Sequence, residues 1–112
     1  MHEKDLQIGI LLDFYGDILA ERRRLVLDLY YNNDYSLAEI AEEIGITRQG
    51  VLDTIKKGKE ELLFLEEKLR LEKKFREAAK ASERLVALVS DSDAISPSIR
   101  SEILALAEVF KA

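Results

Sequence analysis

The sequence of 112 residues contains no cysteine and no tryptophan, and it has only one proline and one histidine. Without cysteine, disulfides and thiolate chemistry are excluded, and the single histidine, His2, lies near the chain terminus. Zinc sites and Ser-His or Cys-His catalysis are therefore not expected, and we expect no metal, no cofactor and no small-molecule substrate. Acidic pairs such as Glu42-Glu43 point about a third of a turn apart on a helix, which indicates surface charge. We expect a binding or regulatory protein and not an enzyme.

Long apolar runs are also missing from the sequence. No run reaches 18 residues, and the first five residues lack the basic-then-apolar order of a signal peptide, so we expect a cytoplasmic protein without membrane insertion. Seventeen Lys and Arg stand against 22 Asp and Glu, which gives a net charge of −5. This charge excludes a chain that coats nucleic acid with its whole surface, so only a local basic patch could bind it.

Apolar residues recur every three or four positions along most of the chain, which predicts helices. A first helix is expected over residues 4–19, bent near Gly16, and a second over residues 20–31, ended by the polar cluster that follows. We therefore predict an all-α protein. Residues 1–60 are expected to form a helical bundle containing a helix-turn-helix, and residues 61–112 a long helical arm and a C-terminal helix.

Residues 36–57 have the pattern of a helix-turn-helix. The segment Ser36-Leu37-Ala38-Glu39 has the form of a capping box and predicts a short helix over residues 37–44. Gly45 follows, where a left-handed backbone costs glycine least, and Thr47 is a suitable N-cap for the next helix. Small and apolar residues that would lock the crossing follow in order: Ala41, Ile46, Val51 and Ile55. A capped helical hairpin with a glycine corner is the alternative interpretation.

The start of the second helix of this motif carries side chains suited to duplex DNA. Arg48 and Gln49 are the candidate base readers, because Arg pairs with guanine and Gln with adenine through two hydrogen bonds. The Thr47 hydroxyl and the first amides of the helix would hold an anion. The remaining outward-facing candidates, in which the lysines would contact phosphates, are Asp53, Lys56, Lys57 and Lys59.

The charges around this motif are divided between its two helices. Segment 48–59 has four basic residues and one acidic residue, a balance of +3, whereas segment 36–47 has three glutamates, a balance of −3. Duplex affinity grows with the number of phosphates neutralised, so a monomer would bind DNA weakly and a dimer would double the count. DNA binding, binding to RNA or protein, and a purely structural motif all stay open. The basic run Arg22-Arg23-Arg24 is either a phosphate clamp or a solvated surface run.

Four segments carry a resemblance to a known family: LLDFY at 11–15, LYYNNDYSLAEIAEE at 29–43, TRQGV at 47–51 and IKK at 55–57. In these segments the chain resembles the YlxM family, small bacterial proteins whose helix-turn-helix is similar to the promoter-reading region of sigma factors. The resemblance covers roughly residues 6–69, and it departs from the family pattern at Gly50, Leu52 and Thr54, where the family has Ala, Tyr and Asn. It implies a regulatory protein encoded beside the genes of the signal recognition particle, with a part in protein targeting. The partners would then be DNA, or the particle's GTPase or its RNA.

The segment from Leu62 to Phe75 has more apolar residues than one helical stripe needs. With no proline before Pro97, the fourth helix is expected to run past residue 75, and Ser96-Pro97 predicts the start of a last helix. Either this last helix covers the apolar surface within the chain, or a second copy does. We expect a homodimer, which would present two recognition helices to neighbouring turns of a duplex. The candidate dimerisation residues are Leu62, Leu65, Leu69 and Phe75.

Overall fold

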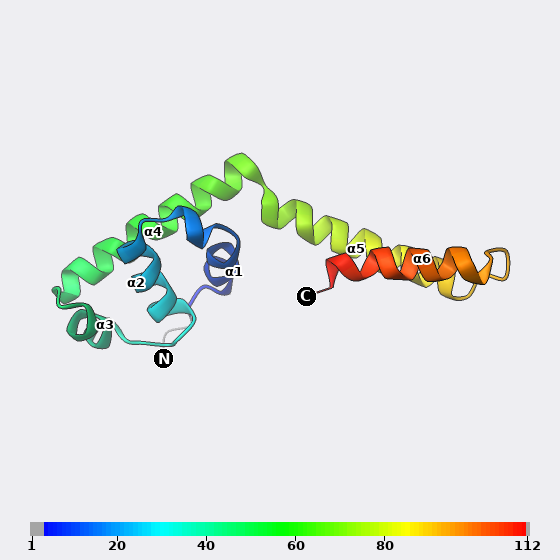
Figure 1. Ribbon diagram of the computed structural model, residues 1–112. Coiled ribbons are helices and arrows are strands. Elements are labelled where there is room, and N and C mark those ends of the chain that lie inside the picture. The colour runs from blue at the N-terminus through cyan, green and yellow to red at the C-terminus, as the bar shows by residue number, and fades with distance from the viewer. Residues whose placement is uncertain (1–3, 112) are drawn as a thin grey trace. The chain divides into compact units, whose positions relative to one another are not determined.

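The computed structural model describes residues 4–111, so His2 lies outside the described part, and Figure 1 shows the helices in chain order. The chain divides into two compact units, Met1–Glu72 and Lys73–Ala112, whereas a boundary between residues 60 and 61 is expected from sequence. Every regular element among the described residues is a helix, which confirms the all-α prediction. None of these helices combines the length and the apolar character needed to cross a bilayer.

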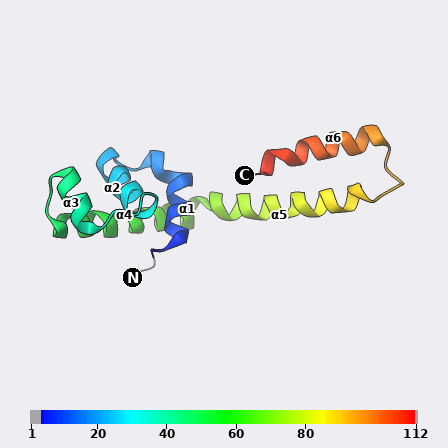
Figure 2. The same cartoon turned by 90° about the horizontal axis from the view of Figure 1, so that it is seen from below.

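Unit 1 is built around one long helix. Its elements are α1 (Leu6–Tyr15), the short 3₁₀ helix η1 (Gly16–Ile18), α2 (Glu21–Tyr31), α3 (Leu37–Ile44) and α4 (Arg48–Leu69). The first three α-helices each pack against α4, and Figure 2 shows them gathered along it. The predicted change of direction near Gly16 is the passage from α1 to η1. The predicted bounds of α3 are confirmed.

The core of unit 1 forms where these helices meet α4. Eleven buried apolar residues make one cluster: Ile8, Leu11, Leu12, Tyr15, Leu19, Val26, Leu27, Ile40, Val51, Ile55 and Leu62. They come from α1, α2, α3, α4 and the α1–α2 connection, so each helix is held by neighbours on more than one side. Burial of this apolar surface is the main force that stabilises such a fold.

The fourth helix ends at Leu69, and the prediction that it runs past residue 75 is wrong. Arg70 takes a left-handed backbone with φ 56°, and α5 (Leu71–Ser90) begins directly after it. Tyr15 explains the break, because its hydroxyl accepts a hydrogen bond from the Leu71 amide at 3.0 Å and donates one to Glu66 Oε1 at 2.6 Å. Glu66 Oε1 also accepts from the Glu72 amide at 3.1 Å. The first amides of α5 are thereby satisfied by groups of unit 1.

The Tyr15 hydroxyl stays protonated in this position. Burial raises its pKa above the ordinary value of 10.0, and the hydrogen bond to the Glu66 carboxylate raises the pKa further. A protonated hydroxyl can donate to the carboxylate and accept from a backbone amide at the same time. The break after α4 is therefore part of the buried structure of unit 1.

Unit 2 is an antiparallel helical hairpin, formed by α5 from Lys73 onward, α6 (Pro97–Ala107) and the 3₁₀ helix η2 (Glu108–Phe110). Three contacts set its direction: the rings of Phe75 and Phe110 have centroids 6.1 Å apart, Ser82 Oγ donates to the Ala107 carbonyl at 3.3 Å, and Arg100 Nε donates to the Val89 carbonyl at 2.9 Å. Ser96 caps α6 and Pro97 stands in its first turn, as predicted. Figures 1 and 2 both show α5 and α6 side by side.

Candidate nucleic-acid interface

The helix-turn-helix predicted from sequence is present. Gly45 ends α3 with φ 81°, and its amide donates to the Ala41 carbonyl at 2.9 Å. Thr47 then caps α4, because its Oγ1 accepts a hydrogen bond from the Gly50 amide at 2.9 Å. At the start of α3 both bonds of the capping box form, with Glu39 N donating to Ser36 Oγ at 3.1 Å and Ser36 N to Glu39 Oε1 at 3.0 Å. These local bonds turn the chain at the glycine and leave the start of α4 at the surface.

The candidate DNA-contacting residues lie on the outer side of α4. Its inner side is buried through Val51, Ile55, Gly58 and Leu62. Six of the seven candidates are exposed, and the seventh, Lys59, is half-buried: Thr47, Arg48, Gln49, Asp53, Lys56, Lys57 and Lys59. The structure therefore brings all seven together within the first three turns of one helix.

The basic charge of this surface is only partly available to a ligand. Lys57 Nζ lies 3.2 Å from Asp53 Oδ2 in an ion pair across one turn of α4. No ion pair among the described residues involves Arg48, Lys56 or Lys59. Three cations per chain are then available for phosphate or base contacts.

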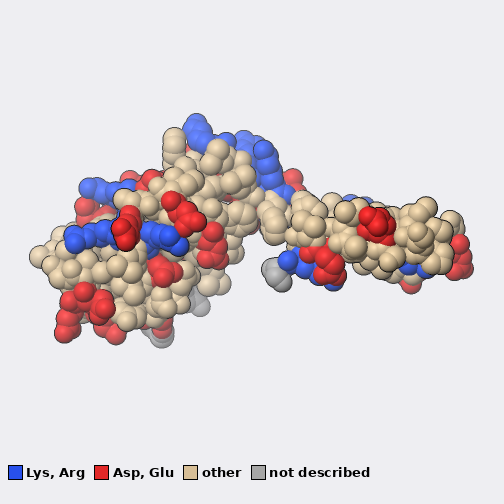
Figure 3. Space-filling view, in the orientation of Figure 1, with Lys and Arg blue, Asp and Glu red and all other residues tan. Residues whose placement is uncertain are grey.

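The neighbouring helix α3 is acidic. Figure 3 shows acidic side chains gathered over α3. The pKa of the Glu39 carboxyl is lowered from its ordinary value of 4.5, first because the Ser36 backbone amide donates to it. This carboxylate therefore stays ionised at the start of α3, and together with Glu42 and Glu43 it makes α3 unfavourable for contact with a polyanion.

An apolar groove on the same face of α4 was not found by sequence reasoning. It has a volume of about 350 Å³ and is lined by Leu52, Ile55, Lys56, Lys59, Glu60 and Leu63. Leu52 and Leu63 are exposed although they are large and apolar. The signal was present in the spacing, because positions 52, 56, 59 and 63 repeat every three or four residues and so share one side of a helix.

The basic run at the start of α2 is used within the fold. Arg23 Nη1 lies 2.6 Å from Glu61 Oε1 on α4, and Arg24 Nη1 lies 2.8 Å from Asp17 Oδ1. Two of the three guanidinium groups therefore have carboxylate partners in unit 1. This arrangement favours a surface run that is balanced internally over a phosphate clamp.

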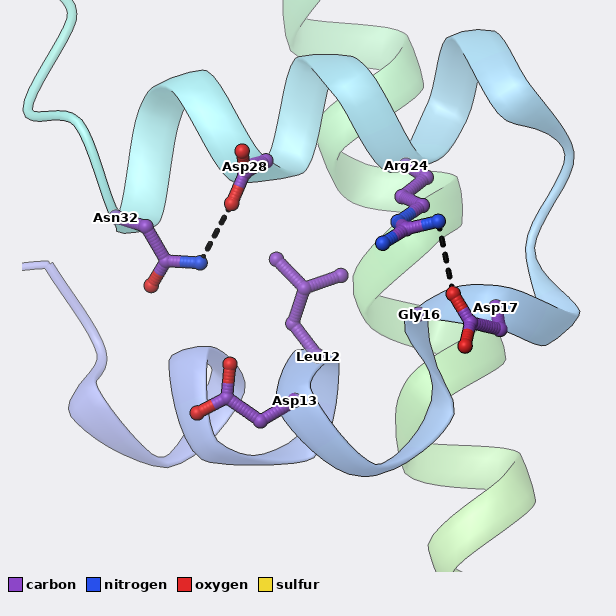
Figure 4. A pocket seen from close by; sticks show the side chains of 7 residues that line it. All are labelled: Leu12, Asp13, Gly16, Asp17, Arg24, Asp28 and Asn32. Atoms are coloured by element: carbon purple, nitrogen blue, oxygen red, sulfur yellow. Dashed lines mark hydrogen bonds and ion pairs between the residues drawn. The ribbon is translucent and has the colours of Figure 1, made fainter.

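A polar hollow of about 180 Å³ lies between α1, η1 and α2, and Figure 4 shows the side chains that line it. Two carboxylates in it already have partners, since Asp17 pairs with Arg24 and Asp28 Oδ1 accepts from Asn32 Nδ2 at 2.7 Å. Nowhere in residues 4–111 do three or more His, Cys, Asp or Glu side chains stand where they could hold a metal ion. The polar groups of this hollow stabilise the corner between α1 and α2.

The candidate dimerisation residues differ in burial and belong to both units. Leu62 is fully buried in the core of its own chain and is not available to a second copy, because α1 and α2 pack on this part of α4. Leu65 is half-buried against the same core, whereas Leu69 is exposed beside the break at Arg70. Phe75 belongs to unit 2, where its ring contacts Phe110.

Comparison with known proteins identifies the family. A family model described as "UPF0122: Putative helix-turn-helix protein, YlxM / p13 like" matches residues 2–101. A UPF0122 protein of Acetivibrio thermocellus is 55% identical over 73 residues, which make up 65% of this chain and 62% of that protein. A UPF0122 protein of Caldanaerobacter subterraneus subsp. tengcongensis is 45% identical over 85 residues, 76% of this chain and 73% of that protein. A UPF0122 protein of Bacillus cereus strain AH187 is 37% identical over 106 residues, 95% of this chain and 96% of that protein.

The resemblance drawn over residues 6–69 is therefore confirmed, and the family match extends beyond it to residue 101. The exposed start of α4, the Gly45 corner and the capping box are the features by which a helix-turn-helix is built. This chain belongs to the UPF0122 family of YlxM/p13-like helix-turn-helix proteins.

Proposed function

We propose that this protein is a DNA-binding regulator that uses the first three turns of α4 as its recognition helix. The observation that carries the proposal is the position of Arg48 and Gln49, which are exposed directly after the turn between the two helices. In a helix-turn-helix, these are the positions from which side chains reach base edges in the major groove. The protein would act by binding, and we propose no catalytic step for it.

The contacts divide into base reading and phosphate binding. Arg48 suits the two acceptors of guanine and Gln49 the donor and acceptor of adenine. Lys56 and Lys59, which have no ion-pair partner among the described residues, would contact phosphates on either side. Lys57 would first have to leave Asp53. Each chain would then neutralise about three phosphates, which predicts weak binding by a single chain at physiological salt.

A duplex selection at low salt, followed by a salt titration of the selected sequence, tests this proposal. We expect the logarithm of the binding constant to fall against the logarithm of salt with a slope of about −3 per bound chain. Lys56→Ala should reduce the slope by about 1 and weaken all sequences alike, whereas Arg48→Ala should cost about 1–3 kcal/mol and relax the preference at one base pair.

Arg22→Ala is the matched control for Arg48→Ala, because Arg22 is exposed on α2, outside the recognition helix. It should leave both the slope and the sequence preference unchanged. If the selection enriches no sequence, or if Arg22→Ala and Arg48→Ala weaken binding equally, DNA recognition by α4 is wrong.

A second candidate function has support from the groove on α4. The exposed side chains of Leu52 and Leu63 give this face an apolar character that phosphates do not use but a protein partner can bury. With the resemblance to the YlxM family, this favours an adaptor that binds the GTPase of the signal recognition particle, whereas the particle's RNA is a partner that the resemblance alone implies. Calorimetry with both purified components tests it, and the expected result is loss of GTPase binding in Leu63→Asp. No binding heat with either component would exclude the adaptor.

A further inference from the structure

One side of the unit 2 hairpin carries an apolar groove. It has a volume of about 370 Å³ and lies between α5 and α6, lined by Ala78, Ala81, Ser82, Leu85, Ile103, Leu106, Ala107 and Phe110. No charged side chain lines it. Leu85 is 45% exposed and Leu106 is 62% exposed, although both are large apolar residues in regular helices. The groove therefore presents apolar surface that a folded protein ordinarily covers.

The hairpin cannot cover this surface by itself. Among the described residues of unit 2, only Ser82, Val89 and Ala107 are buried. Two helices in contact bury one seam each, and a chain segment of about 40 residues rarely has a sufficient core without disulfides, metals or a partner. Unit 2 has no cysteine to form a disulfide. A partner that stays bound while the chain is folded would cover the groove and complete the core of unit 2.

The geometry of the groove fits a second copy of the same hairpin. The lining residues of α5 stand at positions 78, 81, 82 and 85. Those of α6 stand at 103, 106 and 107, and η2 adds 110, so both segments repeat the spacing i, i+3, i+4, i+7. Leucines protrude at Leu85 and Leu106, next to a hollow formed by small residues such as Ala78 and Ala81. One patch thus contains both knobs and holes. This self-complementarity is what an interface with two-fold symmetry requires.

We propose that unit 2 is a homodimerisation module, in which the α5–α6 groove of one chain binds the same groove of a second chain to form a four-helix bundle. Large exposed apolar residues lie further along the hairpin: Leu88 on α5, Ile99 on α6 and Val109 on η2. A stable interface buries roughly 800 Å² per partner, so the contact would extend beyond the groove onto these neighbouring residues. Because charged side chains do not line the groove, two chains of net charge −5 can meet there.

This interface replaces the one expected from sequence. Of the earlier candidates, Leu62 and Leu65 serve the core of unit 1, and only Phe75 belongs to unit 2. The proposal rests on unit 2 alone and is independent of whether α4 binds DNA. A different protein seated in the groove is the alternative occupant, and the test separates the two.

Sedimentation velocity of the full chain over a range of concentrations tests the proposal. We expect a reversible species with twice the 12.8 kDa of one chain. The double variant Leu85→Glu, Leu106→Glu places two carboxylates in the groove of each chain, and it should raise the dissociation constant at least about 100-fold. Ile10→Glu is the matched control, because Ile10 is also 45% exposed but lies on α1 in unit 1. It should leave the dimer intact.

Hydrogen exchange of the unaltered protein gives a second measurement that does not depend on a variant. Amides of α6 should exchange more slowly as the chain concentration rises, whereas amides of α3 should not change. Circular dichroism of the double variant checks that its helices still form in unit 1. A wild-type chain that stays monomeric at all concentrations would refute the proposal and leave the groove to another protein. A dimer that Ile10→Glu breaks and the double variant does not would equally refute it.

Discussion

The two units of this chain are built from similar helices but differ in how those helices are buried. In unit 1 four α-helices meet, and eleven apolar residues from them and from one connection form a continuous core. In unit 2 two helices meet, and the only large aliphatic side chain buried among the described residues is Val89. A helix therefore needs neighbours on at least two sides before its apolar face is buried in a core. A single neighbour leaves part of that face at the surface.

The same contrast separates the proposed roles of the two units. Unit 1 has the rigid support that a recognition helix needs, since α4 is fixed along its length by α1, α2 and α3. Unit 2 has an open apolar groove and so has the character of an interface. Four measurements test this difference between the units.

The largest effect is expected from removing a buried leucine of unit 1. Leu62→Ala opens a cavity at a fully buried position in the core and should lower the free energy of unfolding by about 2–5 kcal/mol. Leu63→Ala is the control, because Leu63 is the next residue of the same helix and is 47% exposed. Its effect should be about 0.5 kcal/mol or less. Chemical denaturation measures the free energy of unfolding of both variants. Equal losses would show that the buried Leu62 side chain stabilises unit 1 no more than the exposed Leu63 side chain.

The second effect comes from adding a single methyl group where α2 and α4 are in contact. A Cβ at Gly58 would lie 2.5 Å from Leu27 Cδ1 and 3.0 Å from Leu27 Cγ, and Leu27 is fully buried. Gly58→Ala should therefore lower stability by about 1–3 kcal/mol through overpacking, even though alanine favours helix.

The matched control for this change is Gly9→Ala in α1. Its Cβ would meet nothing closer than Asn32 Oδ1 at 3.6 Å, so stability should rise by about 0.5–1 kcal/mol. Thermal unfolding compares the two variants. A rise in the melting temperature for Gly58→Ala would show that the α2–α4 contact is looser than the structure indicates.

A smaller effect is expected at the junction where α4 ends. Tyr15→Phe removes the hydroxyl that accepts from the Leu71 amide and donates to Glu66, and it should cost about 1–2 kcal/mol. The Leu71 amide should then exchange faster, as the first turn of α5 loses a partner. Tyr30→Phe is the control, because no hydrogen bond of its hydroxyl occurs among the described residues. If both variants lose the same stability and leave the exchange rate of the Leu71 amide unchanged, the Tyr15 hydroxyl does not stabilise the junction between α4 and α5.

The smallest effect is a pH dependence of amide exchange, which should differ between the start of α3 in unit 1 and the start of α6 in unit 2. The folded pKa of Glu39 lies below its ordinary value of 4.5, so its contribution to stability is present above pH 4.5 and is lost as the pH falls through the lowered pKa. In unit 2, Ser96 caps α6 through the Ile99 amide at 3.2 Å without a carboxylate. Exchange of the Ser36 amide should accelerate in acid relative to Ile99, and Glu39→Gln should remove that difference. If the exchange rate of the Ser36 amide relative to Ile99 does not change in acid, the capping box is contradicted.

Much of unit 1 was predictable because its helix ends depend on local chemistry. Ser36, Gly45 and Thr47 act on backbone groups within a few residues of themselves, so the bounds of α3 and the start of α4 follow from short motifs. The same holds for Ser96 and Pro97 at the start of α6. The candidate DNA-contacting residues follow in turn, since their outward positions are set by the helical repeat counted from Thr47.

The errors at Leu62 and at the end of α4 concern contacts between residues that are far apart in the sequence. The apolar periodicity from Leu62 onward does not show which side chains α1 and α2 cover, and so Leu62 was assigned to a dimer interface. The groove beside Lys56 and Lys59 was missed for a different reason: Leu52 was compared only with the family pattern and was not placed with Leu63, although the helical spacing puts both residues on one side of α4. Exposure of an apolar residue is a property of its neighbours in space.

By itself, the sequence determined that this chain is helical, where its capped helices begin, and that residues 36–57 form a helix-turn-helix, because propensity, capping and turn chemistry act over a few residues. Only the tertiary structure decided that α4 stops at Leu69, since the Leu71 amide is satisfied by a tyrosine hydroxyl 56 residues away in the sequence. It also decided which apolar surface stays open, on unit 2 and not on the inner side of α4. Burial depends on which helices meet, and that meeting is a long-range event that no local pattern records.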